Sequence, residues 1–331
     1  MIELKNNELF FSFPEIHPDV AVIIGFQRTL RIPGDGNTYP LPPGLGNFPL
    51  VHVDDHPETI PASWRKRGGV MLPMYQSEAM WVTFDSPAEY PFAVKVGVGK
   101  INAVTGEPWK DGLNDRQQVH LAIPQQPWLD GFCVGKGVIR QFVAMPLGGG
   151  YTAEEQLTGK AEYGGLQIEV FPLKAKHFKA PRRRVFCESS VSDYQAMGLA
   201  PGGEMEQEIY ADEYQVHQYS RKSHDRCFVH LCDTMSWREM TGQEAPPTPV
   251  TVTEYERWGW PWFRFYSEDL ALDGATRLAA MKSVAEMKKA KGEPPHPGNQ
   301  TFTPKNVEDL SPNANPVKRP DRWWDHPDDD L

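Results

Sequence analysis

Cysteine is scarce in this sequence, and so are the segments that direct a chain to a membrane. Four cysteines among 331 residues are too few for the disulfide framework of a small secreted protein. The first residues, MIELKNN, lack a basic stretch followed by an apolar core. The apolar run at 20–26 is far shorter than the roughly 20 residues of a spanning helix. We therefore expect a cytoplasmic protein with reduced thiols and no membrane partner.

Excess positive charge and familiar catalytic motifs are also missing. The formal net charge of −10 repels nucleic acid and anionic lipid at long range, which argues against nucleic acid as a partner. No GxSxG elbow, HExxH motif or kinase signature occurs. The sequence therefore names no catalytic residue.

Proline and glycine, in contrast, are abundant and divide the chain into short segments. Their 31 and 28 copies favour strands and loops over long helices. Val94, Val96 and Val98 alternate with Lys95 and Gly97, which predicts a strand with one buried face. We expect a β-rich α+β fold, with a mostly antiparallel sheet or sandwich and a few short helices.

One long helix is predicted near the C-terminus, over residues 275–291. Leu278, Met281 and Ala285 recur there at helical spacing, and lysines gather at the C-terminal end, where the helix dipole favours them. We expect residues 1–291 to form a single globular domain.

From Gly292 the composition changes to a Pro-rich, acidic segment without periodicity, which predicts an extended C-terminal arm over 292–331. Trp323 and Trp324 would anchor this arm on its own domain or on a second subunit. The arm therefore predicts a homo-oligomer.

The stretch at 131–174 has the order strand, glycine turn, helical turn, glycine turn, strand. Thr152 and Glu155 form a capping-box pattern just after three consecutive glycines, a position where phosphate-binding loops occur. The glycines match neither GxGxxG nor GxxxxGK[ST], and Glu154 and Glu155 would repel an anion there. The pattern favours a structural hairpin.

The best metal candidate is the HVDDH segment at 52–56. In an extended chain His52, Asp54 and His56 share one face, and two imidazoles with a carboxylate can bind Fe(II) and leave positions open. His120 or His230, each on an expected strand, would complete the site. Short matches of this kind also arise by chance, so a surface His–Asp pair is the alternative.

A basic run stands out in this acidic chain and could bind phosphate, a polyanion or the acidic tail at 328–330. It could equally be a solvated connection. Its cations are Lys174, Lys176, Lys179, Arg182, Arg183 and Arg184.

The central segment GVIRQFVAMPLGGGYTAEEQLTGKAEYGGLQI resembles the signature of a family of uncharacterised proteins of bacteria and fungi. The segments FQRTLRIPGDGNTYPLPPGLGNFPLVHVDD and GGVMLPMYQSEAMW are similar to the same family, so the resemblance covers roughly residues 10–290. It implies no established activity, cofactor or catalytic residue.

Two functional hypotheses follow. The first is a non-catalytic binding or self-assembling protein, homo-oligomeric through its arm and without a cofactor. The second is a metal-dependent oxidoreductase of the non-haem iron oxygenase type, which uses His52, Asp54 and a distant His to hold Fe(II) or another divalent metal.

Overall fold

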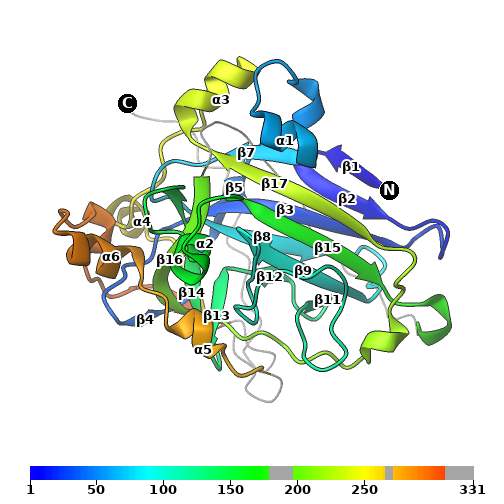
Figure 1. The fold of residues 1–331 in the computed structure, drawn as a ribbon. Coiled ribbons are helices and arrows are strands. Elements are labelled where there is room, and N and C mark those ends of the chain that lie inside the picture. The colour runs from blue at the N-terminus through cyan, green and yellow to red at the C-terminus, as the bar shows by residue number, and fades with distance from the viewer. Residues whose placement is uncertain (179–196, 265–270, 310–331) are drawn as a thin grey trace, which may run out of the picture.

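A sheet of 17 strands provides most of the regular structure in the computed structural model of the protein, which describes residues 1–178, 197–264 and 271–309. The pairings are mostly antiparallel, and β-strands dominate over short helices (Figure 1). The expected β-rich, mostly antiparallel architecture is confirmed to this extent.

The sheet consists of two halves that meet at one strand pair, β16 with β17, through Met197 and Leu231. The first half contains β1 (Ile2–Lys5), β2 (Glu8–Ser12), β3 (Ala21–Thr29), β4 (Thr38–Tyr39), β5 (Gly44–Asn47), β8 (Ala79–Asp85), β12 (Trp128–Leu129), β13 (Gly131–Gly135), β14 (Val138–Pro146) and β16 (Met197–Glu206). The second half contains β6 (Val51–His52), β7 (Val70–Pro73), β9 (Phe92–Val98), β10 (Ile101–Asn102), β11 (Leu121–Ile123), β15 (Leu166–Pro172) and β17 (Asp225–Cys232).

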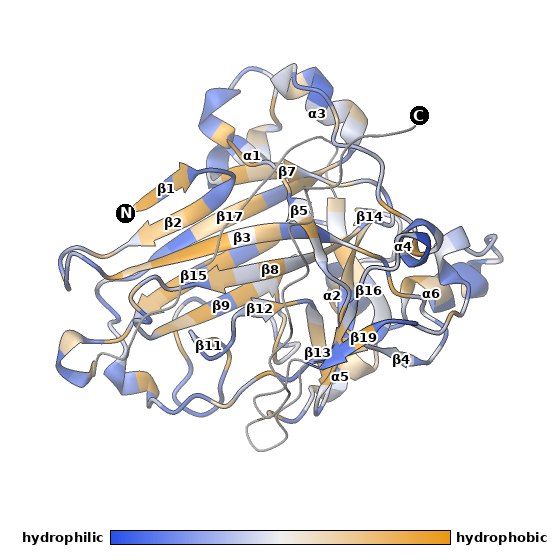
Figure 2. Cartoon of the chain, turned by 180° about the vertical axis from the view of Figure 1, so that it is seen from behind, coloured by the Kyte–Doolittle hydropathy of each residue, from blue (hydrophilic) through white to orange (hydrophobic). Residues whose placement is uncertain are grey.

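The two halves enclose one large hydrophobic cluster. Val22 and Phe26 on β3 and Val96, Ile168 and Val229 on the other half all belong to it. Their alternate spacing along each strand places every second side chain on the inner face. Figure 2 shows hydrophobic residues concentrated along the strands and hydrophilic stretches on α1, α3 and α4.

Strand β9 is buried on both faces, so the expectation of a single buried face is wrong. Lys95, on the outer face, is 2% exposed. Its ammonium group donates to the carbonyls of Lys110 and Gly112 and pairs with Glu169 at 2.9 Å. The loop that follows β10 therefore covers this face and satisfies the buried cation.

The helices are short, and five of the six that are described lie at two places around the sheet. They are α1 (Ala62–Arg67), α2 (Ala153–Thr158), α3 (Thr234–Thr241), α4 (Val252–Trp258), α5 (Thr276–Ala279) and α6 (Val284–Lys291). Helices α1 and α3 lie above β7 and β17, at the top of Figure 1, whereas α2, α5 and α6 lie near β13, β14 and β16. None of the helices in the described ranges is long and apolar enough to cross a membrane.

The long helix predicted over 275–291 is wrong, because the chain breaks into α5 and α6. Ser283 adopts an extended conformation and caps the Glu286 N–H, while the Glu286 carboxylate accepts from the Ser283 N–H. This capping box starts a new helix inside the periodic segment. The capping box at Thr152 and Glu155 is confirmed at the start of α2.

The described part of the arm, residues 292–309, lies on the rest of the chain. β19 (Val307–Asp309) pairs in parallel with β18 (Trp262–Arg264). Phe302 stacks on Tyr39 at 4.9 Å between ring centroids and packs near Trp262 at 5.2 Å. Aromatic contact anchors this first part of the arm on its own domain.

Candidate ligand-binding pocket

A pocket of about 170 Å³ opens between α1, the turn at 162–165 and β17. Trp64 and Arg67 come from α1, Tyr163 from the turn and His230 from β17. Leu147, Met197 and Leu231 supply apolar lining, and Ser63 and Glu162 lie at the polar side. A cavity of about 150 Å³ can hold benzene, so this volume suits a small organic molecule.

Helix α1 presents three pocket residues, Ser63, Trp64 and Arg67, from one short segment. Pro61 precedes the helix, and Gly68, with φ of 64°, ends it. Trp64 is 5% exposed and belongs to a hydrophobic cluster with Trp237 of α3. Because Trp64 fixes the helix on the sheet, Arg67 is positioned along the pocket wall.

The turn at 162–165 is held by a buried carboxylate. Glu154 is 2% exposed and accepts from the N–H groups of Glu162 at 2.9 Å, Tyr163 at 2.9 Å and Gly164 at 2.8 Å. Successive N–H groups of this kind form an anion-binding concavity. The protein fills it with its own side chain, so this loop is part of the pocket frame.

The triple-glycine loop is filled in the same way. The Glu155 carboxylate accepts from the Gly150 N–H at 2.7 Å and from both the N–H and the hydroxyl of Thr152. Glu155, one of the two acidic residues that argued against a phosphate loop, thus occupies the Gly150 and Thr152 N–H groups.

Two glycine pairs bring the strands beside the pocket against β17. Gly69 and Gly165 have φ of 94° and 55°, and a Cβ on either would lie within 2.4 Å of a β17 carbonyl oxygen. Only glycine tolerates both the conformation and this approach. Strands β7 and β15 consequently begin opposite Val229, next to His230.

His230 is buried, neutral and held on two sides. Its ring stacks on Trp64 at 4.6 Å between centroids, and its Nε2 lies 3.0 Å from the Gly68 carbonyl oxygen. Burial, offset in part by the Gly68 hydrogen bond, lowers the pKa of His230 to about 4. In the neutral ring Nε2 donates to Gly68, which leaves Nδ1 as an acceptor without a partner among the described residues.

Arg67 supplies the positive charge. Its guanidinium lies 4.7 Å from the centre of the Tyr163 ring and donates to the carbonyls of Glu162 at 3.2 Å and Tyr163 at 3.5 Å. It forms no ion pair with any residue in the described ranges. Glu162 is the nearby acid, and it pairs with Lys160 at 3.0 Å on the exposed side.

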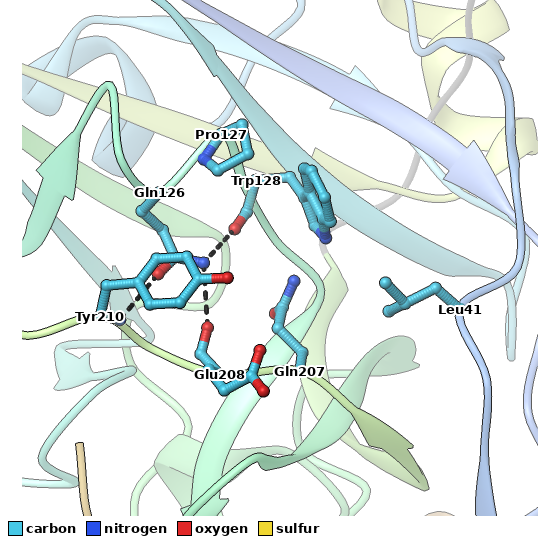
Figure 3. Close-up of a pocket in the computed structure, with 7 residues that line it drawn as sticks. All are labelled: Leu41, Gln126, Pro127, Trp128, Gln207, Glu208 and Tyr210. Atoms are coloured by element: carbon cyan, nitrogen blue, oxygen red, sulfur yellow. Dashed lines mark hydrogen bonds between the residues drawn. The ribbon is translucent and has the colours of Figure 1, made fainter. Parts of the chain in front are cut away.

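A second cavity, near Gln126, is much smaller, at about 10 Å³ (Figure 3). The Gln126 amide donates to the carbonyls of Trp128 at 2.9 Å and Glu208 at 3.1 Å and accepts from the Tyr210 N–H at 3.0 Å. This volume holds at most about one water molecule. The cavity is therefore part of a closed polar network.

Asp130 lies in the same network and is fully buried. Gln207 donates to its carboxyl group at 2.6 Å and accepts from its N–H at 2.9 Å. Burial, opposed by hydrogen bonds from Gln207 and Trp128, raises the pKa of Asp130 to about 8. The carboxyl group is therefore largely protonated at neutral pH.

The geometry expected for the HVDDH segment is wrong. Strand β6 ends at His52, and Val53–Asp55 forms a 3₁₀ helix, so His52, Asp54 and His56 do not alternate along an extended chain. A 3₁₀ turn places successive side chains around an axis instead of on two faces.

The two distant histidines have other partners. His120 Nε2 lies 2.7 Å from Asp212, which also accepts from the Tyr219 hydroxyl, and His230 lines the open pocket. Within residues 1–178, 197–264 and 271–309, no group of three or more His, Cys, Asp or Glu side chains is arranged to hold a metal. The Fe(II) site stays a prediction, which metal analysis of the purified protein tests.

Most of the other predicted site residues lie outside the described residues. These are Lys179, Arg182, Arg183 and Arg184 of the basic run and the anchors Trp323 and Trp324. Lys174 donates to the His217 carbonyl at 2.6 Å, and Lys176 lies in a 3₁₀ turn beside it. The anion-binding and oligomer predictions for this set stay predictions.

Trp64, Arg67 and Tyr163 were not indicated by any motif, because Trp64 and Arg67 on α1 are far from Tyr163 in the sequence. The one sequence signal near them is the pair of Gly-Gly dipeptides at 68–69 and 164–165. Both dipeptides mark a close backbone approach to β17, and the pocket lies between them.

Searches of protein-family models, of curated proteins and of solved structures found no match to this chain.

Proposed function

We propose that the protein is a non-catalytic binding protein and that the pocket beside α1 holds its small-molecule ligand. The observation that carries this proposal is the combination of an open volume with polar groups that the described chain leaves partly unused. Arg67 forms no ion pair there, and His230 offers a free acceptor. Sites for small molecules combine apolar walls with a few convergent polar groups in this way.

The chemistry of the pocket favours binding over catalysis. His230 has its pKa lowered to about 4, so it stays neutral at pH 7 and holds no proton on Nδ1 to donate. The buried thiols are also unsuited to attack, since burial raises the pKa of Cys227 to about 12. These features support recognition of a ligand by shape and hydrogen bonding.

Ligand-observed NMR with a set of small aromatic and aliphatic compounds tests the proposal on the full-length protein. We expect hits that bind the wild type and lose binding in Ser63→Phe, which fills the pocket from α1. Ala62→Phe is the matched control, because Ala62 is the exposed neighbour on the same helix and does not line the pocket. The proposal is contradicted if no compound binds the wild type and Ala62→Phe but fails to bind Ser63→Phe.

We also propose that the protein self-associates through the end of its arm. The support is the sequence alone, in which Trp323 and Trp324 precede an acidic end that complements the basic run. Truncation after Asp309 retains Phe302 and β19, which pack on the domain. We expect light scattering to give a larger mass for the full chain than for the truncated one, and equal subunit numbers would contradict this.

A further inference from the structure

The charge around the pocket indicates which small molecules it accepts. Arg67 lines the pocket, and Lys100 lies 5.6 Å from the centre of the same Tyr163 ring. Burial, together with the neighbouring cations Arg226 and Arg67, lowers the pKa of Lys100, in competition with Asp111 and Glu169. The lone acid of the lining is Glu162, whose charge Lys160 already neutralises. The balance of charge around the pocket therefore favours an anionic ligand.

The remaining walls restrict the anion to an organic one. Leu147, Met197 and Leu231 line the pocket beside the aromatic rings of Trp64 and Tyr163. A strongly hydrated inorganic anion would lose water against these side chains without compensation. A cavity of about 150 Å³ holds benzene, so one six-membered ring with a small substituent fits the pocket.

The polar groups also assign an orientation. A carboxylate carries no proton, so it cannot donate to the free Nδ1 of His230. The Arg67 guanidinium has five N–H donors, of which the described contacts to Glu162 and Tyr163 occupy two. Its planar fork matches a carboxylate, and charge-assisted hydrogen bonds of this type are the strong ones.

We propose that the pocket binds a small aromatic monocarboxylate, with the ring among Leu147, Met197 and Leu231 and the carboxylate on Arg67. This inference rests on the proposed ligand-binding function and adds the chemical class of the ligand. The His230 acceptor would then take a hydroxyl or amino substituent of the ring, or a water molecule.

Calorimetric titration of the full-length protein with benzoate, benzamide and inorganic phosphate tests the class directly. Benzoate and benzamide have the same ring and differ in charge. We expect benzoate to bind the wild type at least about tenfold more tightly than benzamide, the ratio that one charge-assisted hydrogen bond supplies. Phosphate should not displace benzoate at equal concentration.

Arg67→Gln should remove the preference for benzoate, because it keeps a polar side chain without the charge. Arg65→Gln is the control, since Arg65 lies exposed on the same helix and away from the pocket lining. It should keep the preference. Arg67→Lys keeps the positive charge and should keep part of the preference for benzoate. This variant tests the role of the charge separately from that of the guanidinium group.

The outcomes separate the two proposals. Equal affinity of benzoate and benzamide, or an unchanged ratio in Arg67→Gln, overturns the carboxylate inference and leaves the binding pocket. Displacement of benzoate by phosphate at equal concentration overturns the assignment of an aromatic ring. If neither aromatic compound binds the wild type, the inference fails, whereas the ligand screen with Ser63→Phe decides the binding function independently.

Discussion

The small cavity beside Gln126 and the larger pocket beside α1 differ in volume and in the polar groups that line them. At Gln126 three hydrogen bonds use both N–H donors and the oxygen of the amide, and about 10 Å³ remains. At the pocket about 170 Å³ remains, beside an arginine without an ion pair in the described chain and a histidine with a free acceptor. The larger volume and these available polar groups favour the pocket beside α1 as the place where an external partner binds.

The two places also differ in what holds their walls. Around the closed cavity, glutamine side chains connect the segment at 207–212 to the segment at 118–130. Gln118 donates to the Tyr210 carbonyl and accepts from the Asp212 N–H, and Gln126 binds the same segment two residues earlier. At the pocket the Glu154 carboxylate accepts from three successive N–H groups of the turn, and Arg67 donates to two of its carbonyls. Removal of Glu154 would therefore leave three N–H groups of this wall without their acceptor.

Among the substitutions of hydrogen-bonding side chains, the largest effect is expected from Glu154→Ala. It leaves the N–H groups of Glu162, Tyr163 and Gly164 without their acceptor, and we expect a loss of about 3 kcal/mol in the free energy of unfolding. Urea denaturation measures it. Glu162→Ala, which removes an exposed ion pair with Lys160, should cost less than about 0.5 kcal/mol. Similar losses in both variants would mean that the turn does not depend on Glu154.

Gln126→Leu should have the next largest effect, about 2 kcal/mol, because the Tyr210 N–H and two carbonyls lose a buried partner. The adjacent Gln125, which is exposed and donates to Glu213, provides the control substitution Gln125→Leu. That control should be nearly neutral. Equal urea midpoints for the two variants would mean that the hydrogen bonds of Gln126 stabilise the protein no more than those of a surface glutamine.

Asp130 should make the closed network sensitive to rising pH. Its pKa rises from 3.8 to about 8 on folding, so the folded state retains a proton that the unfolded state has lost. Its contribution to stability is complete below pH 4 and falls as the pH rises toward 8, by up to about 1.4 kcal/mol per pH unit. Asp130→Asn should flatten this decline in urea titrations from pH 4 to pH 8. A wild-type slope retained in the variant would exclude Asp130 as its source.

His230 should give the open pocket the opposite and smaller dependence. Its pKa falls from 6.5 to about 4 on folding, so the unfolded state binds the extra proton. Stability should therefore fall as the pH drops from 6.5 toward 4. His230→Phe retains a ring against Trp64 and lacks this titration, so thermal melts of the two proteins should converge at low pH. Parallel curves between pH 6.5 and pH 4 would show that His230 does not titrate on unfolding.

The strands and helix starts could be predicted from the sequence because their signals are local. The alternation of Val94, Val96 and Val98 and the box of Thr152 and Glu155 depend on neighbours within a few residues. The long helix at 275–291 failed for a local reason too, since the capping pattern of Ser283 and Glu286 was present inside the periodic segment.

The candidate site could not be predicted in the same way. Histidine and acid patterns directed attention to the HVDDH segment, whose 3₁₀ turn separates the ligands that alternation would align. The residues that do meet at a cavity are Trp64, Tyr163 and His230, which are separated by scores of positions in the chain.

The sequence by itself determined the β-rich composition of the fold, the approximate positions of several strands and the capping box that starts α2. Tertiary structure decided which of these local elements lie side by side and line the same pocket. The burial of Lys95 and Asp130, the neutral state of His230 and the open volume beside Arg67 all arise from contacts between distant segments. Burial changes the free energy of a charge only once the chain has folded around it, and no local pattern encodes that enclosure.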